Sequence, residues 1–213
     1  NNPTSTAVPA AAIADFVARV PDHVCVLLDE AYCEFNTLDD PDTTLPLLAR
    51  HPNLILLRTF SKVYGLAGLR VGFALCGSSE PVAAVNLVRQ PFFCSAPAQA
   101  AAIEALRHQD AVADRVERAV LARVEVADGL DRLGIPVADS QANFCWLTLP
   151  AEPEEDPAAL ERHVVASLRD RGVLVRAGTA LGREGCLRVT YGTPAENARF
   201  LAAIAEAIAA VRA

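Results

Sequence analysis

The segment RTFSKVYGLAGLR, residues 58–70, decides the fold of this chain. It lies between two short apolar runs, Leu54–Leu57 and Val71–Leu75, and a third run, Val24–Leu28, comes earlier and ends in Asp29-Glu30. An apolar run that ends in polar residues is typical of a parallel strand covered on both faces. Functional side chains in open α/β sheets gather beyond the carboxyl ends of the strands. We therefore expect the polar residues after these runs to meet at one edge of a sheet.

Helical spacing of apolar residues appears before and after these strands. Residues 10–20 predict a helix that Pro21-Asp22 ends. The Ala-rich stretch from Ala98 to Leu133 predicts two helices, and the second is long and exposed on one face, as in helices that join domains.

A change of pattern follows Gly134. Short strands are expected to alternate there with helices near residues 157–171 and 194–212; the strands are Phe144–Leu149, Val173–Arg176 and Cys186–Thr190. Thr193 and Glu196 predict a capping box at the start of the last helix, with Pro194 at its first position. This alternation predicts the α/β class, with a smaller α/β domain at the C-terminal end.

Composition excludes several classes of protein. The chain has 213 residues, 52% of them apolar, and its 26 acidic and 19 basic side chains give a net charge of −7. The chain is too apolar to be disordered, and every apolar stretch is too short for a membrane-spanning helix. The excess of acidic residues argues against nucleic acid as a binding partner. The sequence starts at Asn1 without methionine, and we expect it to be an internal-to-C-terminal fragment. Six cysteines without a C-x-x-C pair, and no secretory leader, predict a cytoplasmic protein without a metal site.

Lysine usage is unusual. Of the 19 basic residues, Lys62 alone is lysine, and the other 18 are arginine. Arginine does not lose its proton to become a nucleophilic amine, whereas lysine does. Lys62 is therefore a candidate for amine chemistry.

Two mechanisms commonly use an apolar strand that ends in an acid such as Asp29. A nucleotide triphosphatase would also need a phosphate loop containing Gly-Lys-Ser/Thr, and Lys62 lies between Ser61 and Val63 instead. A cofactor with an aldehyde and a pyridine ring would need an amine, a carboxylate for the ring nitrogen, and donors for its phosphate. Lys62, Asp29, Ser61 and Arg70 supply these groups, so the sequence favours the second mechanism.

The motifs Asp29-Glu30-Ala31-Tyr32 and Ser61 to Gly72 resemble those of fold-type I aminotransferases, which use pyridoxal phosphate. The resemblance is closest to the histidinol-phosphate aminotransferase branch, and it covers the whole chain as the C-terminal half or more of such an enzyme. It implies a mixed, mostly parallel sheet flanked by helices in residues 1–107, part of the large domain. Residues 108–213 would form the small domain, entered by a long helix, and the enzyme would be a homodimer.

The resemblance also implies roles for individual residues. Seven would bind the cofactor: Asn2 and Tyr32 at its phenolic oxygen, Asp29 at its ring nitrogen, Lys62 through a covalent link, and Thr59, Ser61 and Arg70 at its phosphate. Lys62 would in addition be the catalytic base. Arg188 would bind the α-carboxylate of the substrate, and Arg176 would contact a phosphate on the substrate. Ser5 departs from the family, which usually has glycine there.

Each role has a simpler alternative. Asp29 could cap the following turn, Thr59 and Ser61 could be ordinary turn residues, and Arg70 could form a structural ion pair. Arg176 and Arg188 could be surface charges.

Three functions remain open on the sequence alone. The first is transfer of an amino group between histidinol phosphate, or an aromatic amino acid, and 2-oxoglutarate. The second is decarboxylation of a phosphorylated amino acid, as in the threonine-phosphate decarboxylases that share these motifs. The third is a truncated, inactive domain that binds a partner chain. No membrane or nucleic acid is expected among the partners.

Overall fold

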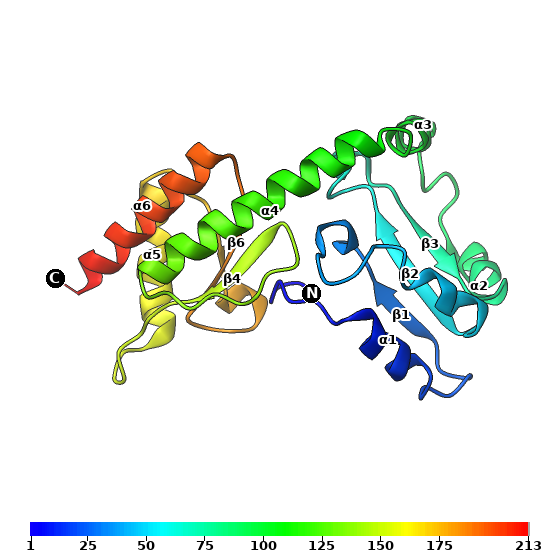
Figure 1. Ribbon diagram of the computed structural model, residues 1–213, viewed down its shortest axis with the longest axis horizontal. Helices are drawn as coiled ribbons and strands as arrows, with labels where there is room; N and C mark the ends of the chain where they lie inside the picture. Colours follow the sequence, from blue (N-terminus) through cyan, green and yellow to red (C-terminus); the bar gives the residue numbers. More distant parts are fainter. Residues whose placement is uncertain (213) are drawn as a thin grey trace. The chain divides into compact units, whose positions relative to one another are not determined.

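The computed structural model describes residues 1–212, which form two compact units (Figure 1). One unit is Val8–Val116. The other combines Asn1–Ala7 with the chain from Glu117 onward. Each unit has its own sheet and its own apolar core. Within residues 1–212, no helix is both long and apolar enough to cross a membrane.

The sheet of the Val8–Val116 unit has three strands in the order β1-β2-β3. Their bounds are Val26–Asp29 (β1), Leu54–Thr59 (β2) and Gly72–Cys76 (β3). β1 and β2 are parallel, and β2 and β3 are antiparallel. The three apolar runs of the sequence therefore do form strands of one mixed sheet. The ends of β1 and β2 and the start of β3 lie at the same edge.

One face of this sheet carries the core of the unit. Leu54 and Leu56 of β2 pack with Val17 of helix α1 (Ala10–Val17) and Leu47 of the 3₁₀ turn η2 (Leu45–Ala49). The opposite face is only partly covered within the described residues: Leu27 is 63% and Leu57 36% exposed, whereas Ile55 is buried. Within residues 1–212 the expected cover on both faces of the first strand is not found, because exposure alternates along β1.

Three helices follow the sheet along the chain: α2 (Glu80–Val88), α3 (Ala96–Ala105) and α4 (Gln109–Arg132). The sequence predicted α3 and α4 but not α2. No residue of α2 is buried, so it lacks the spacing of buried residues that reveals an amphipathic helix. The Ser95 side chain accepts a hydrogen bond from the Ala98 amide and caps α3.

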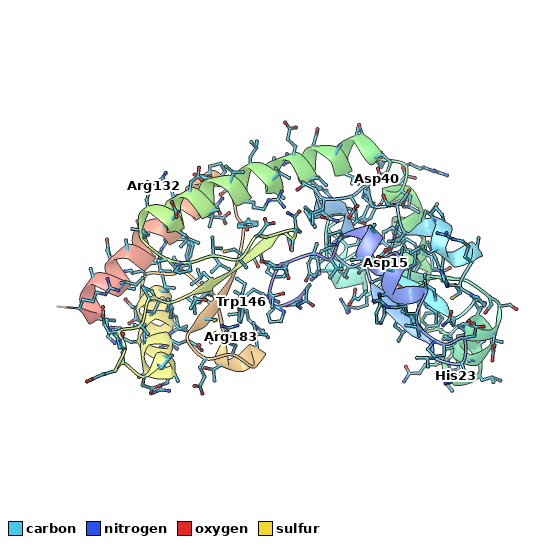
Figure 2. The ribbon with its side chains drawn as sticks, turned by 60° about the horizontal axis from the view of Figure 1, so that its bottom comes forward. Asp15, His23, Asp40, Arg132, Trp146 and Arg183 are labelled. Carbon is cyan, nitrogen blue, oxygen red and sulfur yellow. The ribbon has the colours of Figure 1, made fainter. Side chains whose placement is uncertain are left out.

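The second unit packs two helices, together with the later turns of α4, on an antiparallel sheet of order β4-β6-β5. The elements are β4 (Phe144–Thr148), α5 (Pro157–Asp170), β5 (Arg176–Ala177), β6 (Cys186–Thr190) and α6 (Pro194–Val211). Leu130, Leu168 and Ile204 bring the three helices into one fully buried core. Figure 2 labels Trp146, which lies in β4.

The strand β5 differs from the sequence prediction, whereas the start of helix α6 agrees with it. The strand expected at Val173–Arg176 is Arg176–Ala177 instead, because the Val173 amide bonds back to the carbonyl of Leu168 at the end of α5. The capping box is confirmed, since the Glu196 amide donates to Thr193 Oγ1 (3.4 Å) and the Thr193 amide donates to Glu196 Oε2 (2.7 Å).

Ser5 provides a test of stability in the first turn of the chain. It is fully buried, its φ is 62°, and its hydroxyl has no hydrogen-bond partner among the described residues. A left-handed conformation costs a residue with a Cβ about 1–2 kcal/mol, and glycine avoids this cost. We expect Ser5→Gly to unfold at higher urea, with a free energy of unfolding about 1 kcal/mol above that of Ser5→Ala. The alanine variant is the control, because it removes the hydroxyl and keeps the strain; equal stabilities would contradict the prediction.

Candidate active site

Lys62 lies in a tight loop that follows β2. Phe60 and Val63 are buried on either side of it. The loop closes on itself through hydrogen bonds from the Leu66 amide to the Phe60 carbonyl (2.9 Å) and from the Gly65 amide to the Lys62 carbonyl (3.0 Å). Gly65 has a φ of 73°, which favours glycine. These anchors hold the backbone of Lys62 in place while its side chain stays exposed.

The Lys62 amine lies over the ring of Tyr32. The distance from Nζ to the ring centroid is 5.1 Å. Tyr32 follows β1, the parallel neighbour of β2, and Asp29 is the last residue of that strand. The structure therefore brings Asp29, Tyr32 and Lys62 to one edge of the sheet. The Asp29 carboxylate is exposed there, and its Oδ1 accepts a hydrogen bond from the Ala31 amide (3.0 Å), so Asp29 also caps the following turn.

The three residues expected to bind a phosphate lie at the same edge. Thr59 is the last residue of β2 and pairs with Gly72 at the start of β3, two residues after Arg70. Thr59 Oγ1 accepts a hydrogen bond from the Ser61 amide (3.0 Å), which is a turn interaction. Arg70 is left-handed, with φ 52°, and its Nη1 donates to the Ala67 carbonyl (2.8 Å). It forms no ion pair among the described residues.

The second unit holds the other predicted residues. Arg188 of β6 and Arg176 of β5 are directly paired across the sheet. The Arg188 guanidinium carbon lies 4.9 Å from the centroid of the Phe144 ring, and Nη1 donates to Asn2 Oδ1 (2.7 Å). Arg188 Nε is buried and has no hydrogen-bond partner among residues 1–212. Arg176 is exposed.

The buried Nε of Arg188 indicates a missing acceptor. A buried donor without a partner costs about 1–3 kcal/mol, and native proteins rarely leave one unpaired. The planar guanidinium suits a carboxylate, which accepts two parallel hydrogen bonds. Phe144 and Asn2 fix the plane of this guanidinium, so Arg188 can bind an anion of defined orientation.

Sequence reasoning missed two features of these groups. Phe144 stacks on Arg188 from the neighbouring strand β4, and only the strand register reveals it. Glu30 and Arg58 form a largely buried ion pair beside the site, with 2.9 Å between Arg58 Nε and Glu30 Oε2. The adjacency of Glu30 to Asp29 was the only signal in the sequence. No group of three or more His, Cys, Asp or Glu side chains suited to a metal occurs in the described chain.

Two thiols, Cys33 (half-buried) and Cys145 (buried), predict a pH dependence of stability. Burial raises the pKa of Cys33 from 9.0 to about 12, with the Glu34 charge adding to the effect, and burial alone raises that of Cys145 to about 12. Because the folded chain holds these protons more tightly than the unfolded chain, stability should be level below pH 9 and fall between pH 9 and pH 12.

Urea unfolding at a series of pH values checks this expectation. Cys33→Ala should show a shallower fall in the free energy of unfolding above pH 9 than the wild type. Cys25→Ala, which removes an exposed thiol, is the matched control. If the Cys33→Ala and wild-type curves run parallel through this range, the prediction is wrong.

Residues 1–204 match the family model of aminotransferase class I and II. The chain belongs to this family. The resemblance inferred from the Asp29 and Lys62 motifs is thereby confirmed.

Individual relatives of the aminotransferase family agree in both sequence and fold. The chain is 40% identical to an aromatic amino acid aminotransferase of Cutibacterium acnes, over 98% of this chain and 55% of that protein. It is 41% identical to histidinol-phosphate aminotransferase 1 of Cupriavidus pinatubonensis, over 98% of this chain and 54% of that protein. Histidinol-phosphate aminotransferase from Sinorhizobium meliloti, solved in complex with pyridoxal-5'-phosphate, superposes with a TM-score of 0.85 at 30% identity, covering 99% of this chain and 56% of that one. The α/β fold class is confirmed, and the chain spans about half the length of these relatives.

Proposed function

We propose that this chain is the lysine-bearing part of an aminotransferase that uses pyridoxal phosphate. The enzyme would transfer an amino group between histidinol phosphate, or an aromatic amino acid, and 2-oxoglutarate. The observation that carries the proposal is the Lys62 amine, 5.1 Å from the Tyr32 ring centroid at the sheet edge where Asp29 also lies. The names of the similar aminotransferases support it.

The residues at this edge fit the cofactor. Lys62 offers the only side-chain amine in the sequence, and an exposed loop makes it accessible. Asp29 offers an exposed carboxylate, which would hold a proton on the ring nitrogen by opposite charge. The Tyr32 hydroxyl would bind the phenolic oxygen, and Thr59, Ser61 and Arg70 would bind the phosphate. Asn2, which belongs to the other unit, is proposed for the phenolic oxygen from the family resemblance alone. When bound, pyridoxal phosphate supplies an electron sink for the bonds at the substrate α-carbon.

Lys62 would then move the proton. The lysine amine would be the nearest base for the proton on the substrate α-carbon. Its backbone is fixed by the buried neighbours Phe60 and Val63, so the side chain alone has to move. Tyr32, close to the amine, would orient it.

The arginines would select the substrate. Arg188 would bind the α-carboxylate through Nε and one Nη, with its plane set by Phe144 and Asn2. Arg176, its direct cross-strand neighbour, would add a second positive charge for a substrate that also carries a phosphate. A paired set of arginines suits a substrate with two anionic groups, such as 2-oxoglutarate or a phosphorylated amino acid. Histidinol phosphate has a phosphate and no α-carboxylate, and Arg176 would contact that phosphate.

We also propose the wider setting of the chain. Residues 1–107 would belong to the large domain and residues 108–213 to the small domain of a cytoplasmic homodimer. Six cysteines without a disulfide fit a reducing compartment. The exposed apolar side chains of Leu87, Val88 and Phe92, which are 83–97% exposed, fit a surface that is covered in the assembled protein.

Borohydride reduction after incubation with pyridoxal phosphate tests the proposal. A phosphopyridoxyl group should be trapped on the peptide that contains Lys62, and peptide mass mapping would locate it. The peptide that carries the N-terminal amine is the internal control for non-specific labelling. Absence of an adduct on Lys62, in this chain and in the longest form of the protein that can be prepared, would overturn the proposal.

The reaction type needs a second measurement. Formation of glutamate from 2-oxoglutarate would show amino transfer, whereas release of carbon dioxide from a phosphorylated amino acid would show the decarboxylase. An adduct on Lys62 without either product would favour the inactive domain that binds a partner chain.

A further inference from the structure

A buried polar network lies directly behind the proposed cofactor residues. Glu30 is 9% exposed; its Oε1 accepts a hydrogen bond from Thr44 Oγ1 (2.5 Å), and its Oε2 accepts one from Arg58 Nε (2.9 Å). Arg58 also donates from Nη1 to Asp42 Oδ1 (2.7 Å) and from Nη2 to the Pro41 carbonyl (2.5 Å). The network therefore joins the loop around residues 41–44 to the ends of both parallel strands.

The residues of this network are direct sequence neighbours of the proposed cofactor residues. Glu30 directly follows Asp29, and its amide donates to the Leu57 carbonyl of β2 (2.9 Å). Arg58 directly precedes Thr59, near the start of the Lys62 loop. Successive side chains of a strand point to opposite faces, so Arg58 continues the buried face of Leu54 and Leu56 while Thr59 points to the other face.

Stability alone is a weak explanation for this ion pair. Removing two charges from water costs several kcal/mol for each ion, and apolar pairs of similar volume are often as stabilising or more so. An ion pair with fixed hydrogen bonds has a defined geometry, which an apolar contact lacks. Three of the bonds to Glu30 and Arg58 reach the loop at residues 41–44, so the pair fixes the strand ends against a third segment.

We propose that Glu30 and Arg58 are positioning residues, which together set the place of Tyr32 and Lys62 at the sheet edge. This inference rests on the proposed function for its meaning in catalysis. The structural part of the inference does not depend on the cofactor. It states that, without the Glu30–Arg58 ion pair, the Lys62 amine no longer stays over the Tyr32 ring.

The single lysine gives a direct readout. Reductive methylation with ¹³C-formaldehyde would place methyl groups on Lys62 and on the N-terminal amine, and the ring of Tyr32 should shift the Lys62 signal away from its position in the urea-unfolded chain. In Glu30→Gln, we expect this signal to lose at least half of that displacement. In Asp42→Asn, which removes only the 63%-exposed partner of Arg58, the signal should stay within a tenth of its wild-type displacement.

A double variant separates positioning from stability. We expect Glu30→Met/Arg58→Met to unfold at a urea midpoint equal to or above that of Glu30→Gln, and still to lose the displacement of the Lys62 signal. In unmethylated protein, both variants should bind pyridoxal phosphate at least tenfold more weakly than Asp42→Asn. A Lys62 signal in Glu30→Gln and in the double variant that matches Asp42→Asn would overturn the inference, whether or not the wild type binds the cofactor. A wild type without an adduct on Lys62, in this chain and in the longest form of the protein that can be prepared, would overturn the proposed function instead.

Discussion

Replacing Lys62 with arginine is expected to lower kcat for amino transfer by about 10³-fold or more. A positioned general base contributes about 10²–10⁴-fold to a rate, and the same residue would also form the covalent link to the cofactor. Arginine keeps the positive charge over the Tyr32 ring but stays protonated at neutral pH, so it can supply neither function. Glutamate production from 2-oxoglutarate, measured with saturating donor and cofactor in the whole protein, checks this expectation.

The control for Lys62→Arg is a measurement of its stability, which shows whether the fold is preserved. Lys62 is exposed, so Lys62→Arg should keep the wild-type urea midpoint and lose the borohydride-trapped adduct at residue 62. A small external amine should restore part of the turnover in Lys62→Ala, because it can replace the missing base. A Lys62→Arg enzyme with more than a tenth of the wild-type kcat would show that the lysine is not the catalytic base.

Replacing Arg188 with glutamine is expected to lower kcat/KM by about 10²- to 10³-fold. Loss of one partner from a desolvated, hydrogen-bonded charge pair costs about 2–5 kcal/mol, and each 1.4 kcal/mol is a factor of ten. Glutamine keeps a donor near Asn2 but has neither the charge nor the donor fork for a carboxylate. Steady-state kinetics with the amino acid donor and with 2-oxoglutarate should both show the loss, since both carry an α-carboxylate.

Arg183→Gln is the matched control, because Arg183 is an exposed arginine shortly before β6. Its kcat/KM should stay within twofold of the wild type. The adduct on Lys62 should form normally in Arg188→Gln, which separates loss of substrate binding from loss of the cofactor. A parallel loss of adduct would assign Arg188 to the cofactor and contradict its proposed role as the residue that binds the substrate carboxylate.

Local patterns in the sequence accounted for most of the elements. Apolar runs predicted β1, β2 and β3, and Thr193 with Glu196 predicted the start of α6, because strands and helix caps depend on neighbouring residues. The predictions that failed concern burial, which depends on residues that are distant in the sequence. Exposure of Leu27 on one face of β1 reflects what packs against the sheet, and no periodicity along four residues encodes that.

In the candidate site too, local motifs were predicted from the sequence and contacts between distant residues were not. The motifs identified Lys62, Asp29 and Tyr32, and the parallel pairing of β1 and β2 places them at one edge, as the general rule for α/β sheets predicts. The stacking of Phe144 on Arg188 and the bond from Arg58 to Glu30 connect distant parts of the chain. Side-chain contacts of this kind require a known strand register, so a single sequence does not reveal them.

The union of Asn1–Ala7 with the chain after residue 116 has a consequence for the order of folding. The bond between Asn2 and Arg188 spans 186 positions, so its closure requires almost the whole chain. The Val8–Val116 unit needs only local and medium-range closures, which form faster than distant ones. During synthesis the Lys62 loop can therefore be complete long before β6 leaves the ribosome. A chain that stops before Cys186 would present the Lys62 amine and keep Arg176, but it would lack Arg188, the arginine proposed to bind the substrate carboxylate.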